Sequence, residues 1–388
     1  MRLPSWLLLV FSPGCVLAQA ASSGTVPFVL DGNRVYAQVA FILPEGKPRE
    51  ALLFVDLGSS AVMLSKKLYE ELSPGSKKTL GLRIGKVDVP LESANVAVDD
   101  SLPFSIGEDR EVEGLLPAGV LQNYQVRFDY AARTMALAQP ATLQMRGTAI
   151  PFRLNPKTGL IAIEVRIDGH AYPITIDNGS GYTWVRQATA QQWIARHPDW
   201  QRGVGAVGPS NMRMADDGIE ASAALVRISA IELGPLSARQ AGALAIGPDD
   251  QGHDFMDWYS AKNAVSVIGW LGGNVLRHFR ITIDYPNKMS YWEPQSALDC
   301  HDLDYVGLTL LSRRGDYFVA GVATRNGRPA VTGVEVADKL VQIDALPTYG
   351  ASREAIFAAM HGNAGETRSL VLERAGSKIQ VRARVTAF

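Results

Sequence analysis

Apolar and polar residues alternate along most of this chain in short runs, which glycine, proline and acidic residues separate. Residues 35–42 and 161–167 are clear examples, because a strand with one buried face has this period of two. Three stretches instead predict short helices, namely 66–72, 187–196 and 352–361. The pattern therefore predicts a mainly β protein with a few helices.

One succession of motifs occurs twice. The apolar run 52–55 leads into Asp56 and a Gly-Ser turn, and the run 172–176 leads into Asp177 and a second Gly-Ser turn. Each copy continues with a distal apolar-glycine motif and a strand that ends in Asp-Tyr. These are Gly114 with Asp129-Tyr130, and Gly269 with Asp284-Tyr285. The repeat predicts two similar units, which we place at residues 28–140 and 148–295, the second lengthened within 185–265.

The two ends of the chain differ from the repeat. Residues 1–20 combine Arg2, a short apolar run and an Ala-Gln-Ala exit, which is typical of a cleaved signal peptide. This predicts a periplasmic or secreted protein. A lipoprotein site at Gly14-Cys15 is an alternative, although Ser12-Pro13 replace its usual aliphatic lead-in. Residues 304–388 follow another order of strands and one helix, so we expect a separate C-terminal domain.

Composition and charge argue against several classes of function. The net charge of −1 gives no electrostatic basis for binding nucleic acid, and no apolar run reaches the length of about 18 residues that predicts a transmembrane segment. The histidines lack metal-binding spacing, so we expect no metal, and no organic cofactor is implied. Residues 203–208 match G-x-G-x-x-G without the flanking strand and helix of a nucleotide site, which predicts a loop or flap.

Asp56 and Asp177 carry the chemistry that the sequence suggests. Each follows an apolar strand, where an ionised carboxylate is costly unless it is paired or hydrogen-bonded. If the repeat brings them together, the two carboxyl groups cannot both ionise and share a proton, which is an arrangement suited to activating water. The alternative is that both belong to ordinary Asp-Gly turns at strand ends.

The paired Asp-x-Gly-Ser turns and their distal motifs resemble the retropepsin-like aspartic proteases, in tandem as in the bilobal pepsin-like enzymes. The resemblance implies two β-barrel lobes within residues 28–295 (the bilobal acid-protease fold), with Asp56 and Asp177 catalytic and a peptide or protein as substrate. In this family the glycines let the two loops approach, and the serine hydroxyls hold the outer carboxylate oxygens. The supporting residues implied are Gly58, Ser59, Asn178, Gly179 and Ser180.

The C-terminal domain resembles a PDZ domain, which is an α+β fold. The resemblance implies that a loop and strand at Gly307, Leu308, Thr309 and Leu310 bind the C-terminus of another protein through backbone N–H groups. A second possibility is that this domain only packs against the second lobe.

One position departs from the protease pattern. Where the family has a hydroxyl residue after each aspartate, this chain has Leu57 and Asn178, and Leu57 cannot donate a hydrogen bond worth about 0.5–1.5 kcal/mol. Two functions therefore stay open. One is an exported aspartic endopeptidase, with residues near 85–105 and 203–255 covering the cleft. The other is a catalytically inactive periplasmic peptide-binding or assembly protein that keeps the cleft.

Overall fold

The computed structural model describes residues 22–388 apart from 44, 73–78, 100, 103, 107–109, 250 and 251. The predicted signal peptide and the alternative site at Cys15 lie outside the described residues. The described chain is mainly β, as predicted, and contains a β-barrel within a system of 23 paired strands and a second sheet of seven strands. Helices are present at all three predicted stretches.

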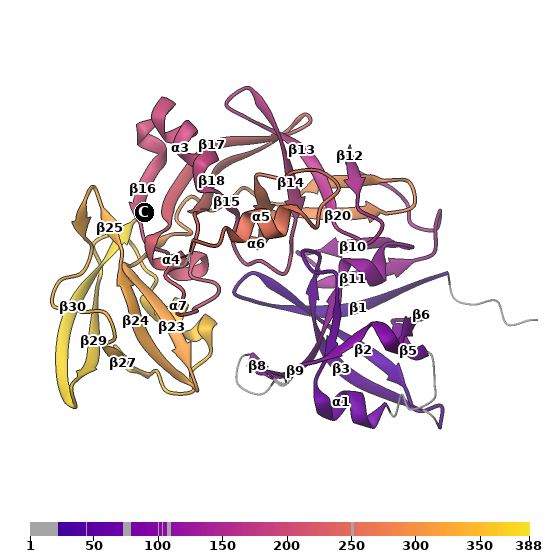
Figure 1. Cartoon of the computed structure of the whole chain (residues 1–388), viewed down its shortest axis with the longest axis horizontal. Coiled ribbons are helices and arrows are strands. Elements are labelled where there is room, and N and C mark those ends of the chain that lie inside the picture. Colours follow the sequence, from indigo (N-terminus) through magenta and orange to yellow (C-terminus); the bar gives the residue numbers. More distant parts are fainter. Residues whose placement is uncertain are drawn as a thin grey trace, which may run out of the picture.

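The first unit is the indigo to purple part of Figure 1 and contains the antiparallel pair of strands β2 and β3. Its elements are β1 (Ser23–Asp31), β2 (Arg34–Ile42), β3 (Pro48–Asp56), β4 (Val62–Leu64), α1 (Lys66–Glu71), β5 (Thr79–Ile84), β6 (Val87–Glu92), η1 (Ser93–Asn95), β7 (Val96–Val98), β8 (Phe104–Ile106), β9 (Arg110–Pro117), α2 (Ala118–Leu121), β10 (Gln125–Asp129) and β11 (Thr134–Ala138). Strand β3 alternates as its sequence predicts. Leu53 and Val55 are buried in the core, whereas Phe54 and Asp56 lie half-buried on the other face.

The second unit repeats this arrangement with additional strands. Its elements are β12 (Thr148–Leu154), β13 (Ile161–Ile167), β14 (His170–Ile176), β15 (Trp184–Arg186), α3 (Gln187–Arg196), η2 (Pro198–Trp200), β16 (Gln201–Val204), η3 (Gly208–Ser210), α4 (Ile219–Ser222), β17 (Ala224–Leu233), β18 (Leu236–Ile246), α5 (Phe255–Ser260), β19 (Gly269–Leu271), α6 (Gly273–Leu276), β20 (Phe279–Asp284) and β21 (Met289–Pro294). The residues that lengthen this unit form the long hairpin β17–β18 and the segment before it.

Six strands join the two units in one antiparallel arrangement, in the order β1, β11, β10, β20, β21, β12. Its centre is the pairing of β10 with β20, in which Gln125 lies opposite Asp284 and Asp129 opposite Arg280. The strands that close each repeated copy therefore meet at the boundary between the units. This pairing fixes how the two units face each other, and Figure 1 shows β10 and β20 at this boundary.

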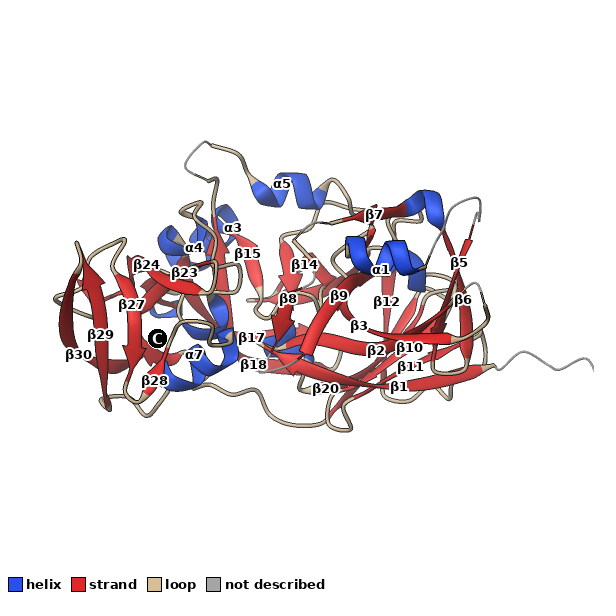
Figure 2. Cartoon of the chain, turned by 90° about the horizontal axis from the view of Figure 1, so that it is seen from below, coloured by secondary structure: helices blue, strands red, loops and turns tan. Residues whose placement is uncertain are grey.

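The C-terminal part forms the seven-stranded sheet, which lies at one end of the molecule in Figure 2. Its elements are β22 (Asp304–Val306), β23 (Leu308–Arg313), β24 (Asp316–Val322), β25 (Thr324–Arg325), β26 (Arg328–Pro329), β27 (Lys339–Ile343), β28 (Leu346–Pro347), α7 (Arg353–Met360), β29 (Thr367–Arg374) and β30 (Ser377–Ala387). Strands β25 and β26 leave this sheet, and β25 pairs with β16 of the second unit. One apolar core continues from the second unit into this part.

No helix among the described residues is long and apolar enough to cross a membrane.

Candidate active site

Asp56 and Asp177 occupy equivalent positions at the ends of two buried strands. Strand β3 runs parallel to β9 and brings Asp56 opposite Pro117, whereas β14 runs parallel to β19 and brings Ile176 opposite Leu271. After each aspartate the chain turns at a Gly-Ser pair. A short helix follows each distal strand, and its backbone binds the turn, because Ala118 N donates to Ser59 O (3.1 Å) and Gly273 N donates to Ser180 O (2.7 Å).

The two turns meet each other, with the glycine of each beside the aspartate of the other. A Cβ atom on Gly58 would lie 2.2 Å from Asp177 Oδ2, and a Cβ on Gly179 would lie 2.4 Å from Asp56 Cγ. No side chain fits at these distances, so both positions require glycine. The structure thus brings together the two predicted carboxylates, one from each unit.

Backbone N–H groups hold each carboxylate within its own turn. Gly58 N donates to Asp56 Oδ1 (2.8 Å), and Gly179 N donates to Asp177 Oδ1 (2.9 Å). Across the turns, Leu57 N donates to Asn178 Oδ1 (2.9 Å), a buried hydrogen bond between the units. No reciprocal bond from the side chain of Leu57 is chemically available, and the amide nitrogen of Asn178 is buried with no partner among the described residues.

Burial and proximity raise the pKa of both carboxyl groups. Desolvation is the largest cause for Asp177, and the charge of Asp56 adds to it, so the pKa of Asp177 lies well above its usual value. The pKa of Asp56 is also raised by desolvation, but backbone N–H donors, the hydrogen bond with Asp177 and the charge of Arg34 oppose this rise. The pair therefore holds a shared proton to higher pH than a free aspartate does.

The hydroxyl of Ser180 does not hold the outer carboxylate oxygen of Asp177, which corrects the expectation from the family resemblance for this residue. Ser180 Oγ lies 2.8 Å from Tyr182 O and accepts a hydrogen bond from Trp270 Nε1 (2.5 Å). It is directed into the second unit and away from Asp177. The backbone N–H of Ser180, not its hydroxyl, donates to Asp177 Oδ1 (3.1 Å). The backbone N–H of Ser59 donates to Asp56 O (3.3 Å), and a backbone hydrogen bond from Ser59 also lowers the pKa of the Asp56 carboxyl.

Arg34 is a site residue that the sequence did not reveal. It follows the hairpin turn between β1 and β2, and that turn lies against the second unit, since Gly181 and Gly273 would collide with Gly32 O and Asn33 O if either carried a Cβ. From this position the guanidinium lowers the pKa of Asp56 and donates from Nη2 to Met212 O (2.6 Å). In the sequence only the Gly32-Asn33 turn can be recognised, and it does not indicate which residues Arg34 contacts.

The expected peptide site on the C-terminal domain is filled by the chain itself. Leu308, Thr309 and Leu310 are buried. The side chain of Asn211 pairs with the backbone of Leu310, accepting from its N–H (2.7 Å) and donating to its carbonyl (3.0 Å). Ser312 N then donates to Met214 O (3.0 Å). The edge of β23 is therefore occupied by residues 211–214, which contradicts a free site for another protein's C-terminus and agrees with the packing role.

Two parts of the predicted flap segments take other positions. Gly203, Gly205 and Gly208 face Thr324, Ala323 and Tyr305 of the C-terminal domain, with too little space for a Cβ at Gly203 or Gly208. Residues 203–208 thus attach that domain and do not cover the cleft. Similarly, the tip of the β5–β6 hairpin lies against the backbone of β1 at Gly24 and Thr25, because Gly85 is packed there.

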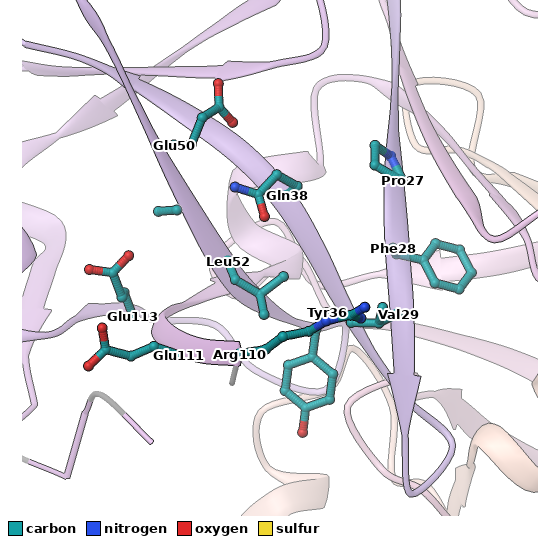
Figure 3. A pocket seen from close by; sticks show the side chains of 11 residues that line it. Pro27, Phe28, Val29, Tyr36, Gln38, Glu50, Leu52, Arg110, Glu111 and Glu113 are labelled. Atoms are coloured by element: carbon teal, nitrogen blue, oxygen red, sulfur yellow. The ribbon is translucent and has the colours of Figure 1, made fainter. Parts of the chain in front are cut away.

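Two cavities lie on either side of Tyr36, which lines both of them. One, of about 470 Å³, belongs to the first unit alone and is shown in Figure 3, with Glu50, Glu111 and Glu113 among its lining residues. The carboxylate of Glu113 is already paired with Arg49 (2.5 Å). The other cavity, of about 580 Å³, lies between the first unit and the C-terminal domain and includes Arg34 in its wall. Neither aspartate lines either cavity.

No group of three or more histidine, cysteine or carboxylate side chains in the described part of the chain is arranged to hold a metal ion. No protein-family model matches this chain, and no curated protein matches it.

Proposed function

We propose that the protein is an exported aspartic endopeptidase that hydrolyses peptide bonds with water activated by Asp56 and Asp177. In this proposal the first and second units are retropepsin-like lobes and residues 304–388 are a PDZ-like domain used for packing. The observation that carries the proposal is the mutual contact of the two turns, in which Gly58 adjoins Asp177 and Gly179 adjoins Asp56. Ordinary turns at separate strand ends have no reason to meet in this way.

The electrostatics of the pair assign a role to each carboxyl group. Asp177 holds the shared proton, because its burial and the charge of Asp56 both oppose its ionisation. Asp56 is the base, because backbone donors and the charge of Arg34 favour its ionised form. Asp56 removes a proton from a bound water as that water attacks the scissile carbonyl carbon, and Asp177 donates its proton to the carbonyl oxygen. When the tetrahedral intermediate collapses, Asp56 gives its proton to the departing amine nitrogen and a hydroxyl proton of the intermediate returns to Asp177.

The test is cleavage of a reduced, carboxymethylated protein between pH 3 and 7. The variants Asp177→Asn and Asp56→Asn are expected to lose at least about a hundredfold in rate, since each removes an acid or base from the reaction. Asp168→Asn is the matched control, because Asp168 also lies in an Asp-Gly turn of the second unit but is paired with Arg196 (2.8 Å). Equal rates for the wild type and Asp177→Asn across this range would contradict the proposal.

A second candidate function is a catalytically inactive periplasmic protein that binds extended peptides in the same cleft. It is favoured by Leu57, which is 1% exposed and offers no hydroxyl, and by the unpartnered amide nitrogen of Asn178. A peptide with a hydroxymethylene group in place of the scissile amide separates the two. A peptidase binds this analogue far more tightly than the parent peptide. A binding protein has equal affinity for the two peptides and releases the parent peptide intact.

A further inference from the structure

The cavity between the first unit and the C-terminal domain contains two guanidinium groups that converge on one acceptor. Arg34 Nη2 (2.6 Å) and Arg353 Nη1 (2.8 Å) both donate to Met212 O. Both side chains line the cavity. Neither forms an ion pair with a carboxylate among the described residues, and Arg34 Nε is buried without a hydrogen-bond partner there. Two like charges held together, each with donors to spare, favour an anion between them.

The surroundings of these arginines strengthen that preference. Ala351, Ser352 and Arg353, at the start of α7, lie in the same wall, so the positive end of this helix faces the cavity. Burial lowers the pKa of Arg353, and the neighbouring charge of Arg34 lowers it further. Asp31 and Asp99 also line the cavity. Burial and the charge of Glu354 raise the pKa of Asp31, and the charges of Arg34 and Arg353 lower it, so the two arginines also act on this carboxyl group.

Another part of the cavity wall is apolar and includes Phe54 of β3, the strand that ends at Asp56. Phe54, Met63, Ile106 and Leu115 form it, and the guanidinium of Arg34 lies over the ring of Phe54, 6.0 Å from its centroid. Phe54 and Asp56 are two residues apart on the same face of β3, which corresponds to about 7 Å along a strand. A peptide held at the aspartates therefore reaches this cavity within one or two residues.

We propose that this cavity recognises a carboxylate of the bound peptide through Arg34 and Arg353, so that the protein selects peptides with an acidic group close to the scissile bond. The inference rests on the proposed function insofar as the ligand is a peptide. It assigns a recognition role to the C-terminal domain, which supplies Arg353. The carboxylate belongs either to a glutamate or aspartate side chain or to the C-terminus of the peptide. Its aliphatic portion contacts Phe54 and Leu115, and its oxygens accept from the guanidinium groups.

The experiment measures peptide binding by calorimetry to the full mature chain carrying Asp177→Asn, at pH 6, where a glutamate is ionised. The probes are synthetic decapeptides in pairs that differ only in glutamate or glutamine at one position, and a further pair that differs in a free or amidated C-terminus. We expect one position to favour the acid at least about tenfold, which is about 1.4 kcal/mol. If the side-chain pairs are equal and the terminal pair differs, the carboxylate recognised is the C-terminal one.

Variants of the arginines test the assignment. Arg353→Gln is expected to abolish the preference and Arg353→Lys, which keeps the charge, to retain part of it. The control is Arg382→Gln, which removes the same charge from an exposed position on β30. Equal binding of every acid and amide pair overturns the inference, and so does an equal effect of Arg353→Gln and Arg382→Gln. If the preference is present but the wild type cleaves none of the peptides, the inference stands and the proposed hydrolysis fails.

Discussion

At the scale of single residues, the site depends on what surrounds two carboxyl groups. Desolvation and the charge of Asp56 act on Asp177 in the same direction, whereas Asp56 receives compensating interactions from Gly58 and Arg34. The chemical difference between two identical side chains therefore comes from their neighbours. It also has consequences for stability, because a carboxyl group with a raised pKa binds its proton more tightly in the folded protein than in the unfolded chain.

The stability contribution of Asp177 is expected to be lost as the pH rises. It is fully present below the unfolded pKa of about 3.9 and disappears as the pH passes through the raised folded pKa. Asp177→Asn removes this dependence, so the variant gains stability relative to the wild type between pH 4 and 7. Urea denaturation at several pH values measures the difference. Asp168→Asn should show the opposite trend, since hydrogen bonds from His197 and Arg196 lower the pKa of Asp168. Parallel curves for the wild type and Asp177→Asn would refute the assignment.

The close approach of the turns makes Gly58 intolerant of a side chain. In Gly58→Ala the new methyl group meets Asp177 Oδ2 at 2.2 Å, so one of the two turns has to move. We expect a loss of about 1–3 kcal/mol in the free energy of unfolding, together with loss of activity. Thermal and chemical denaturation measure it. Ser60→Ala, in the same turn, serves as the control and should be nearly neutral; similar effects of both changes would argue against the contact.

At the scale of elements, the segment 211–214 connects three parts of the molecule. The carbonyl oxygen of Met212 accepts hydrogen bonds from Arg34 and Arg353. The side chain of Asn211 accepts a hydrogen bond from the backbone at the edge of β23. The carboxylate of Glu220 fixes the segment by accepting from Arg213 N (2.8 Å) and Met214 N (2.9 Å), and from the side chain of Asn211 (3.0 Å). A short irregular segment is thus held by hydrogen bonds to all three parts of the molecule.

Removing the side chain of Asn211 should release the edge of β23. In Asn211→Ala the N–H of Leu310 loses its acceptor, and an unsatisfied buried donor costs about 1–3 kcal/mol. Hydrogen exchange at the amide of Leu310 is expected to accelerate, while amides in β29 keep their protection. Ser222→Ala is the control, because among the described residues the Ser222 hydroxyl bonds within its own helix region, to Gly218 O (2.8 Å) and Ile219 O. Unchanged exchange at Leu310 would show that other contacts hold this edge.

At the scale of the whole molecule, the C-terminal domain is fixed to the second unit by more than apolar packing. Arg227 of β17 forms an ion pair (2.6 Å) with Asp302, in the segment that leads into the C-terminal domain, and the two side chains are only 3% and 9% exposed. Arg227 also donates to Phe388 O near the end of the chain (3.3 Å). Arg313 of the C-terminal domain and Asp216 of the second unit form another ion pair, but both side chains are mostly exposed.

These two ion pairs should differ strongly in their importance. Asp302→Ala leaves the guanidinium of Arg227 buried without its partner, which is expected to cost about 3–5 kcal/mol. Asp216→Ala breaks the exposed pair and is expected to cost less than about 1 kcal/mol. Both are measured by urea denaturation at pH 7. A small effect of Asp302→Ala, comparable to that of Asp216→Ala, would mean that the domain is held mainly by its apolar contacts.

The parts of the structure that could be predicted are those that depend on residues close together in the sequence. The apolar runs before Asp56 and Asp177, the glycine turns after them and the two matching distal motifs sufficed to predict strands and the repeat. The contacts that could not be predicted join residues far apart in the chain. Arg34 and Met212 are separated by 178 residues, and Asn211 and Leu310 by 99. No periodicity in either segment specifies its partner, because such contacts follow from how whole units dock.

The central claim, that Asp56 and Asp177 share one proton, is tested most directly by titrating their carboxyl carbons. Protein labelled with ¹³C at the aspartate carboxyl groups is followed by NMR from pH 2 to 9, with Asp177→Asn and Asp56→Asn used to assign the two signals. We predict that both signals change together in two separated steps, the second well above the usual range of aspartate, and that either substitution leaves a single step. Two independent titrations near pH 4, unaffected by substitution of the other residue, would contradict the account.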